Sequence, residues 1–311
     1  MPALDCAFFY HRPGLAICSI ELACGEQESN FPARIIPASI SPTLRNHPIS
    51  FCGLSIYPSG DMMLTSLRFL FASTCLLLPA AHAGDAHWSY HGDQGPAHWG
   101  EVGSPLCASG KTQSPIDIDR HQVQSKKLTP ESLQVNYRQL PLRLLNNGHS
   151  IQADALGDES LTFKGEAYRL RQFHFHVPSE HLFNHRAYPM EMHLVNQTVD
   201  GRLLVLGVMI EEGKENAELA HLWRAMPSVE GQKAVLAGKD SPDLEKLLPG
   251  KTHHFYYTGS LTTPPCSEGV QWVLYERPIE LSRQQIEQFR KLFKDNHRPA
   301  LGLEGREIDE D

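Results

Sequence analysis

The chain has 311 residues and a formal charge of −8 at pH 7. It contains no run of arginines or other basic patch, which argues against binding to a nucleic-acid backbone. It also contains no glycine-rich phosphate loop and no nucleophile elbow, which argues against a nucleotide site and a serine-hydrolase site.

The N-terminal part of the chain contains the pattern of a secretory signal peptide at residues 62–83. A weakly basic start is followed by an apolar run and then by the small-x-small sequence Ala81-His82-Ala83. The apolar run is too short to span a membrane. Since a signal peptide belongs at an N-terminus, we predict that residues 1–61 are a leader foreign to the native protein; a disordered extension is the alternative.

Cleavage near Ala83 would leave residues 84–311, a length typical of one domain with a sizeable core. Only two of the seven cysteines, Cys107 and Cys266, would remain. Two cysteines in an exported chain suggest one disulfide. We therefore predict a periplasmic or secreted protein with no membrane span after cleavage.

The first predicted elements of this part are an irregular arm and a set of short strands. The arm, residues 87–100, is rich in glycine and proline and is expected to pack through Trp88 and Trp99. Residues 133–163 contain several short alternating runs separated by turn residues, which predicts a mainly antiparallel sheet. The continuous apolar run at 203–210 predicts a central buried strand.

Helices are expected to be few and short. Residues 215–226 have apolar side chains at helical spacing, and a short turn is expected after Ser241. Ser282 and Gln285 have the spacing of a capping box, which predicts a helix over residues 282–293.

Three histidines lie on two predicted strands that follow one another closely. Alternate side chains of a strand share a face, so Gln172, His174 and His176 point the same way. A second alternating run places Glu191 and His193 on one face. If the two strands pair, the three imidazoles converge on one point.

Such a set of histidines suits a catalytic zinc site, which takes three protein ligands and leaves a fourth position for water. The set contains no cysteine, which argues against a closed structural zinc site. Gln172 and Glu191 each precede a histidine by two residues and would fix its ring. A pair such as His174 and His176 is by itself common on ordinary half-buried strands; His193 and the two placed partners favour the metal site.

Five motifs in this order identify a family: Asn-Asn-Gly-His at 146–149, Gln-Phe-His-Phe-His at 172–176, Ser-Glu-His at 179–181, Glu-Met-His-Leu-Val at 191–195 and Gly-Ser-Leu-Thr-Thr-Pro-Pro at 259–265. With them the chain closely resembles the α-class carbonic anhydrases in their exported bacterial form, from about Trp88 to Leu301. The resemblance implies a mostly β single domain. It would have a large, mostly antiparallel twisted central sheet, a few peripheral short helices and the active site at the centre of the sheet.

The resemblance also assigns the residues of the metal site. The zinc ligands would be His174, His176 and His193, and their rings would be held by Gln172, the backbone carbonyl of Asn296 and Glu191. Thr262 would accept a hydrogen bond from zinc-bound hydroxide and donate its own proton to Glu180.

The remaining assignments concern the substrate, the proton and the disulfide. The carbon dioxide pocket would be lined by Val195, Val205, Leu261, Thr263 and Trp272. His149 would be the proton shuttle, beside a polar wall of Tyr90, Asn147 and Gln152; at Gln152 several animal members carry asparagine. Cys107 and Cys266 match the disulfide common in exported bacterial members.

The implied reaction is the reversible hydration of carbon dioxide to bicarbonate and a proton by one zinc ion per chain. Zinc lowers the pKa of a bound water to about 7, a value for which carbonic anhydrase is itself the usual example. Residues 84–311 would form the catalytic domain, and a homodimer is left open.

A zinc-dependent esterase or other hydrolase and a non-catalytic zinc-binding protein are the alternative functions. A zinc-dependent esterase would need a general base and room for a leaving group, and neither is recognisable. A non-catalytic zinc-binding protein would carry a flexible histidine-rich tract, whereas the longest here is His253-His254.

Overall fold

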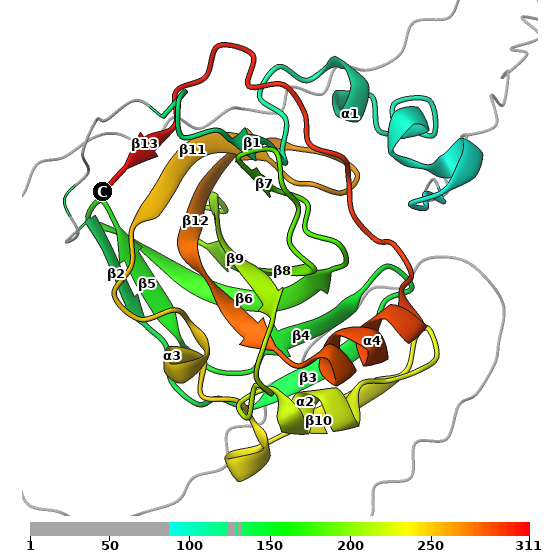
Figure 1. The fold of residues 1–311 in the computed structure, drawn as a ribbon, viewed down its shortest axis with the longest axis vertical. Helices are drawn as coiled ribbons and strands as arrows, with labels where there is room; N and C mark the ends of the chain where they lie inside the picture. The colour runs from blue at the N-terminus through cyan, green and yellow to red at the C-terminus, as the bar shows by residue number, and fades with distance from the viewer. Residues whose placement is uncertain (1–86, 124–128, 130–131) are drawn as a thin grey trace, which may run out of the picture. The chain divides into compact units, whose positions relative to one another are not determined.

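The structure is a computed structural model and describes residues 87–311 apart from 124–128 and 130–131. The predicted leader, signal peptide and cleavage site therefore lie outside the described residues. The described part is built on an eleven-stranded sheet, in which nine strands follow the order β10-β3-β4-β6-β8-β9-β12-β11-β13 (Figure 1). The two remaining strands lie off this path, with β5 between β2 and β6.

The strands of this sheet are β2 (Leu133–Asn136), β3 (Leu142–Asn146), β4 (Ile151–Ala155), β5 (Ser160–Phe163), β6 (Glu166–His176), β8 (Met190–Gln197), β9 (Leu203–Glu212), β10 (Lys233–Leu236), β11 (His254–Ser260), β12 (Glu268–Leu281) and β13 (Asp309–Glu310). A separate parallel pair consists of β1 (Asp117–Ile118) and β7 (Leu182–Phe183). The helices are α1 (Leu106–Ser109), α2 (Ala220–Ala225), α3 (Leu244–Leu247) and α4 (Arg283–Leu292), with 3-10 turns η1 (Gly92–Gln94), η2 (Pro96–His98) and η4 (Gly238–Asp240). The predicted mostly β fold with few short helices is confirmed.

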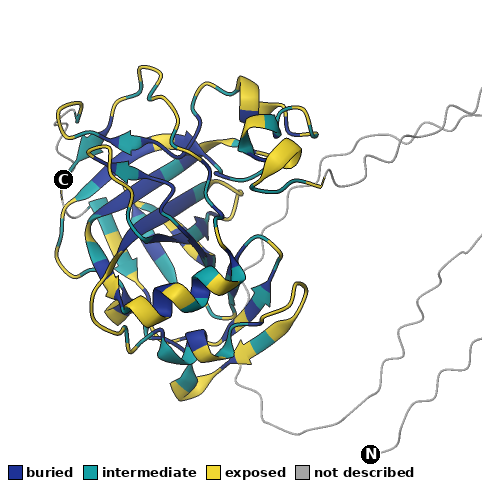
Figure 2. Cartoon of the chain, turned by 45° about the vertical axis from the view of Figure 1, so that its right-hand side comes forward, coloured by how far each residue is buried: buried dark blue, intermediate teal, exposed yellow. Residues whose placement is uncertain are grey.

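The predicted central strand is β9, which lies between β8 and β12. Its side chains from Leu204 to Ile210 are buried on both faces, as its continuous apolar run requires. It pairs antiparallel with β8 but parallel with β12, because β12 follows only after a long connection. Figure 2 shows buried residues concentrated in these middle strands and exposed residues on the helices and outer loops.

The two faces of the central strands are covered differently. Phe173 and Phe175 of β6 belong to the large apolar core, and Phe175 packs edge-on against Trp223 of α2 and Phe289 of α4. The opposite face of the same strand carries His174 and the other polar residues that alternate with these phenylalanines. The period of two along the strand therefore assigns one face to packing and leaves the other for chemistry.

Two helix predictions have different outcomes. Helix α4 has its predicted capping box, with Ser282 accepting from Gln285 N. The helix predicted over 215–226 is wrong in length, because α2 spans only Ala220–Ala225. At the N-terminal end of the predicted range, the Asn216 N–H donates to Gln285 Oε1 at 3.0 Å. At the C-terminal end, Pro227 disfavours helical backbone at the residue before it. Among the described residues, no helix is long and apolar enough to cross a membrane.

Candidate active site

The three histidines converge as the strand pattern predicts. His174 of β6 lies directly opposite His193 of β8 in the antiparallel register. The ring centroids of His176 and His193 are 4.6 Å apart, and His174 lies 5.0 and 5.3 Å from them. The three side chains can each offer one nitrogen within 4.8 Å of the others. This spacing suits three ligands of one metal ion.

The hydrogen bonds of the rings decide which nitrogens face the centre. His174 Nδ1 donates to Gln172 Oε1 at 2.8 Å, and His176 Nδ1 donates to the Asn296 carbonyl at 2.7 Å. His193 is turned the other way, since its Nε2 donates to Glu191 Oε1 at 2.7 Å. These acceptors have no hydrogen to give, so the opposite nitrogens carry the lone pairs: Nε2 of His174 and His176 and Nδ1 of His193.

Burial and mutual proximity keep these imidazoles neutral. Burial lowers the pKa of His176 to about 4, and it lowers the pKa of His193 as well. The pKa of His174 lies well below its usual value because of burial and because of the other two rings. His176 Nε2 is buried and has no hydrogen-bond partner among the described residues. Since buried polar atoms are nearly always paired, this atom and its two neighbours fit a metal ion.

Glu191 is the centre of a buried hydrogen-bond chain behind His193. Its Oε2 accepts from the backbone N–H groups of Glu180 and His181, both at 2.8 Å, and its Oε1 also accepts from His181 Nδ1 at 2.7 Å. Burial alone would raise the pKa of this carboxyl, but the imidazoles of His181 and His193 hold it well below its usual range. These three side chains are close enough for a metal. However, His181 Nδ1 and His193 Nε2 already form hydrogen bonds with Glu191. This group therefore supports the His193 ring and is not a second metal site.

The hydrogen-bond chain continues from His181 through Tyr257 to Ser114. Tyr257 O–H lies 2.6 Å from His181 Nε2, and Ser114 Oγ lies 2.8 Å from the Tyr257 oxygen. Gly207 of β9 leaves room for this arrangement, since a Cβ there would lie 3.2 Å from Glu191 Oε1 and 2.4 Å from the side chain of Leu274. A glycine inside an apolar strand run was the available signal for such a close approach.

Thr262 and Glu180 lie beside the histidines. Glu180 Oε1 is 3.5 Å from His176 Nδ1, and its Oε2 is 3.9 Å from His193 Nδ1. Burial raises the pKa of the Glu180 carboxyl to about 7, although the His193 ring and hydrogen bonds from Thr262 and the Arg298 N–H act in the opposite direction. The Thr262 hydroxyl is thus close to Glu180, although Oε2 has no partner of full hydrogen-bond geometry among the described residues. The Thr262 hydroxyl and the Glu180 carboxylate are therefore adjacent but not fully aligned for a hydrogen bond.

Arg298 supports Glu180 and was not predicted from the sequence. Its backbone N–H donates to Glu180 Oε1 at 2.8 Å. Its buried guanidinium donates to Gln113 Oε1 and to the carbonyls of Ser114 and Cys107, at 2.8 to 2.9 Å. It joins Glu180 to the segment that carries Cys107. Nothing in the local pattern around Arg298 distinguishes it from a surface arginine.

The predicted disulfide between Cys107 and Cys266 is present. Cys266 N–H donates to the Thr263 carbonyl at 2.8 Å, and Leu261 N–H donates to the Ser267 carbonyl at 2.9 Å. The bridge therefore attaches the loop that contains Thr262 to α1.

An apolar surface adjoins the histidines on one side. Val195, Val205 and Trp272 stand in one row across β8, β9 and β12, because the register pairs Val195 with Val205 and Val205 with Trp272. Leu261 packs against the same cluster. Thr263 lies two residues after Leu261 and is half-buried. Four of the five predicted pocket residues thus lie in one apolar cluster.

His149 lies on the turn between β3 and β4 and is half-buried. Its ring stacks on Trp88 of the arm, with centroids 3.7 Å apart and planes inclined by 10°, and Tyr90 lies 6.3 Å away. Asn147 Oδ1 accepts from His149 N–H at 3.0 Å, and its amide donates to Gln152 Oε1 at 3.4 Å. The predicted polar wall is therefore continuous with the turn that carries His149.

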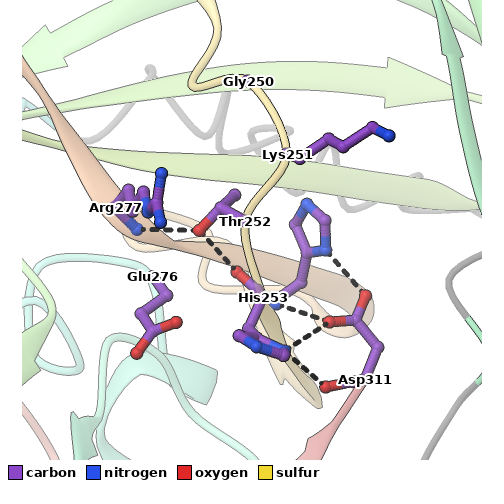
Figure 3. A pocket seen from close by; sticks show the side chains of 8 residues that line it. Gly250, Lys251, Thr252, His253, Glu276, Arg277 and Asp311 are labelled. Atoms are coloured by element: carbon purple, nitrogen blue, oxygen red, sulfur yellow. Dashed lines mark hydrogen bonds and ion pairs between the residues drawn. The ribbon is translucent and has the colours of Figure 1, made fainter.

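A cavity of about 590 Å³ lies where β11 begins, away from His174, His176 and His193. It is lined by Gly250, Lys251, Thr252, His253, His254, Glu276, Arg277 and Asp311 (Figure 3). The Asp311 carboxylate accepts from the backbone and ring N–H groups of His254, at 2.9 and 2.7 Å. These contacts attach β13 to β11, so the histidines of this cavity have a structural role.

Comparisons with known proteins agree with this geometry. Residues 94–309 match the family model described as eukaryotic-type carbonic anhydrase. The chain is 41% identical over 228 residues to a carbonic anhydrase of Klebsiella pneumoniae, covering 72% of this chain and 90% of that protein. It is 39% identical to one of Neisseria gonorrhoeae over 234 residues, covering 74% of this chain and 90% of that protein.

Solved structures give the same result. The α-carbonic anhydrase of Thermovibrio ammonificans, solved with the inhibitor sulfanilamide, has a TM-score of 0.70 and 44% identity, covering 73% of this chain and 100% of that chain. The enzyme of Photobacterium profundum has a TM-score of 0.66 and 39% identity, covering 72% and 100%. The chain therefore belongs to the α-class, or eukaryotic-type, carbonic anhydrases, and it is a carbonic anhydrase enzyme.

Proposed function

We propose that His174, His176 and His193 hold one zinc ion and that the enzyme uses it to hydrate carbon dioxide reversibly to bicarbonate and a proton. The observation that carries the proposal is the set of three converging imidazole nitrogens, one of which is buried without a partner. Neutral imidazoles suit zinc and leave its full positive charge, whereas a carboxylate ligand would reduce it. When bound, zinc supplies hydroxide at neutral pH by lowering the pKa of a water ligand, the effect for which carbonic anhydrase is the usual example.

Three acceptors keep the ligand rings in place. Gln172, the Asn296 carbonyl and Glu191 each fix one ring and one tautomer, so that the free nitrogens face a common point. The two hydrogen bonds from backbone N–H groups hold Glu191 itself.

Thr262 and Glu180 would orient the attacking oxygen. A threonine hydroxyl that donates to a carboxylate can only accept from a third group, because it has one hydrogen. Glu180 thus makes Thr262 an acceptor, which directs a lone pair of the nucleophile toward the substrate carbon. The Arg298 N–H holds the other carboxylate oxygen.

The apolar row of Val195, Val205 and Trp272, with Leu261 and Thr263 beside it, would receive carbon dioxide. The substrate is small and apolar, so valine and leucine side chains suit it. Hydrogen-bond donors would suit it less well, because carbon dioxide could not replace the water that they bind. Bicarbonate is charged and is not retained by such a surface.

His149 would carry the product proton to buffer. An imidazole titrates near neutral pH, so it can accept a proton and release it again at little cost in free energy. The polar side chains of Tyr90, Asn147 and Gln152 would order the water through which the proton reaches it.

The decisive test is stopped-flow hydration of carbon dioxide by the zinc-loaded protein, before and after chelation, with the zinc content measured in parallel. We expect one zinc per chain, loss of activity with the metal and recovery on adding zinc back. A metal-free protein with unchanged hydration activity would refute the proposal.

We also propose that residues 62–83 are a signal peptide and that residues 84–311 form the exported catalytic domain. The disulfide and the similarity to bacterial enzymes support an extracytoplasmic site. N-terminal sequencing of exported protein should begin at or near Gly84, and non-reduced peptides should contain the Cys107–Cys266 pair. A mature chain that retains Cys6 to Cys52 would contradict this assignment.

A further inference from the structure

The turn that carries His149 is attached to a loop much later in the chain. This loop, residues 227–232, connects α2 to β10. Gly231 N–H donates to the Asn146 carbonyl at 2.8 Å, and Asn146 N–H donates to the Gln232 carbonyl at 3.1 Å. The Asn146 side chain donates to the Pro227 carbonyl at 3.1 Å. These bonds fix the position of the loop residue Glu230 relative to the turn.

The side chain of Glu230 lies against Gly148, the residue before His149. Gly148 has a φ of +81°, and a Cβ there would lie 2.8 Å from Glu230 Cδ and 2.9 Å from Glu230 Oε1. A larger residue would therefore displace the carboxylate. Glu230, Gly148, His149 and Trp88 line one cavity of about 470 Å³.

Several charged groups surround His149 in this cavity. His87 and His91 come from the arm, and Lys291, Lys294 and Asp295 come from the end of α4 and the residues after it. Asp295 is paired with His297, whereas Glu230 forms no hydrogen bond or ion pair with another described residue. Burial lowers the pKa of His149, the Glu230 carboxylate opposes this effect, and His87 adds to it.

We propose that Glu230 is a positioning residue for proton release, whose carboxylate stabilises the protonated, Trp88-stacked imidazole of His149. The inference rests on the proposed role of His149 as the shuttle. In each turnover His149 accepts one proton through water and becomes an imidazolium, and a buffer base then removes that proton and restores the neutral ring. Without a nearby carboxylate, a half-buried imidazole in a cavity that two lysines also line would hold the proton poorly.

The first test is an NMR titration of His149 in the zinc-loaded enzyme, with the resonance assigned by its loss in His149→Ala. Glu230→Gln should lower the pKa of His149, and the difference between the variants should shrink at high salt, where exposed charges are screened. Glu245→Gln removes the same charge from α3, whose residues do not line this cavity, and should leave the titration unchanged. An unchanged titration in Glu230→Gln would overturn the inference.

The second test separates this inference from the function on which it rests. In weak buffer near neutral pH, Glu230→Gln should slow turnover about two- to threefold and leave the interconversion of carbon dioxide and bicarbonate unchanged. It should have no effect in a His149→Ala background. If His149→Ala turns over at the wild-type rate, the shuttle assignment fails. If only His149→Ala is slow and Glu230→Gln matches the wild type, the role of Glu230 alone fails.

Discussion

The proposed metal site, which we call the floor, and the proposed proton shuttle, which we call the mouth, are built in different ways. At the floor, the histidines project from paired strands in fixed register, and each ring donates to one acceptor. At the mouth, His149 lies on a turn, is half-buried and stacks on Trp88 from the arm. A ligand set has to hold one geometry, which strands and buried acceptors provide. A proton carrier has to reach solvent, and a turn at the surface allows this.

Asn296 joins the two regions. Its backbone carbonyl accepts from His176 at the floor, and its side-chain amide donates to the His149 carbonyl at 2.8 Å and to the Phe175 carbonyl at 3.0 Å. Asn296 thus holds the backbone of both regions, at Phe175 and at His149. The two regions therefore differ in how tightly their histidine side chains are held. This difference predicts that changes at the floor abolish the reaction, whereas changes at the mouth slow only proton release.

The largest expected effect is at the floor. His193→Ala removes one of the three proposed ligand nitrogens and leaves Glu191 without one of its donors, so zinc and hydration activity should both be lost. Metal analysis and stopped-flow hydration measure the two quantities. His254→Ala, a histidine bound to Asp311 away from the site, is the matched control and should keep both. A His193→Ala protein with full zinc and full activity would disprove the ligand assignment.

A smaller effect is expected where the floor orients the nucleophile. Thr262→Val keeps the shape of the side chain but removes its hydroxyl, and should lower kcat/KM about 100-fold, since misorientation of this kind is costly. Zinc content should not change. Thr258→Val, at an exposed position of β11, is the control. Wild-type kcat/KM in Thr262→Val would show that the hydroxyl does not orient the reaction.

His149→Ala should affect the mouth alone. It should slow turnover in weak buffer by at least about tenfold, the low side of what a positioned acid–base group contributes, and leave zinc content and the interconversion of carbon dioxide and bicarbonate unchanged. Imidazole in solution should restore much of the rate and saturate. Because His87 and His91 line the same cavity, they could mask the loss. The triple variant tests this, and wild-type turnover there would refute the shuttle.

The same difference explains what could be predicted from the sequence. The strand period of two places His174 and His176 on one face, and a single antiparallel pairing brings His193 opposite His174. Contacts between distant segments carry no such signal. The stacking of Trp88 on His149, the clamp of Arg298 on Glu180 and the close approach of Glu230 to the turn depend on loops whose paths no local pattern determines.

The smallest effect, and the sharpest test of the comparison, concerns the stacked pair at the mouth. An aromatic contact of this kind is worth about 0.5–1.5 kcal/mol. Trp88→Ala removes this contact, so it should reduce the population of the present ring orientation of His149, relative to other orientations, about 2- to 10-fold. Turnover in weak buffer should change by no more than that factor, and the interconversion of carbon dioxide and bicarbonate should not change.

Trp88→Phe is the matched variant, because it keeps a ring for His149 and preserves most of the edge-on packing against Trp99 and Tyr90. It should stay close to the wild type in weak buffer, whereas Trp88→Ala should not. Thermal unfolding of both variants separates a loosened arm from a change at His149. If Trp88→Ala lowers zinc content or slows the interconversion itself, the arm supports the floor as well, and the separation of floor from mouth is wrong. If the two variants release protons at the same rate, the stack has no part in the shuttle, and the position of His149 is set by its turn alone.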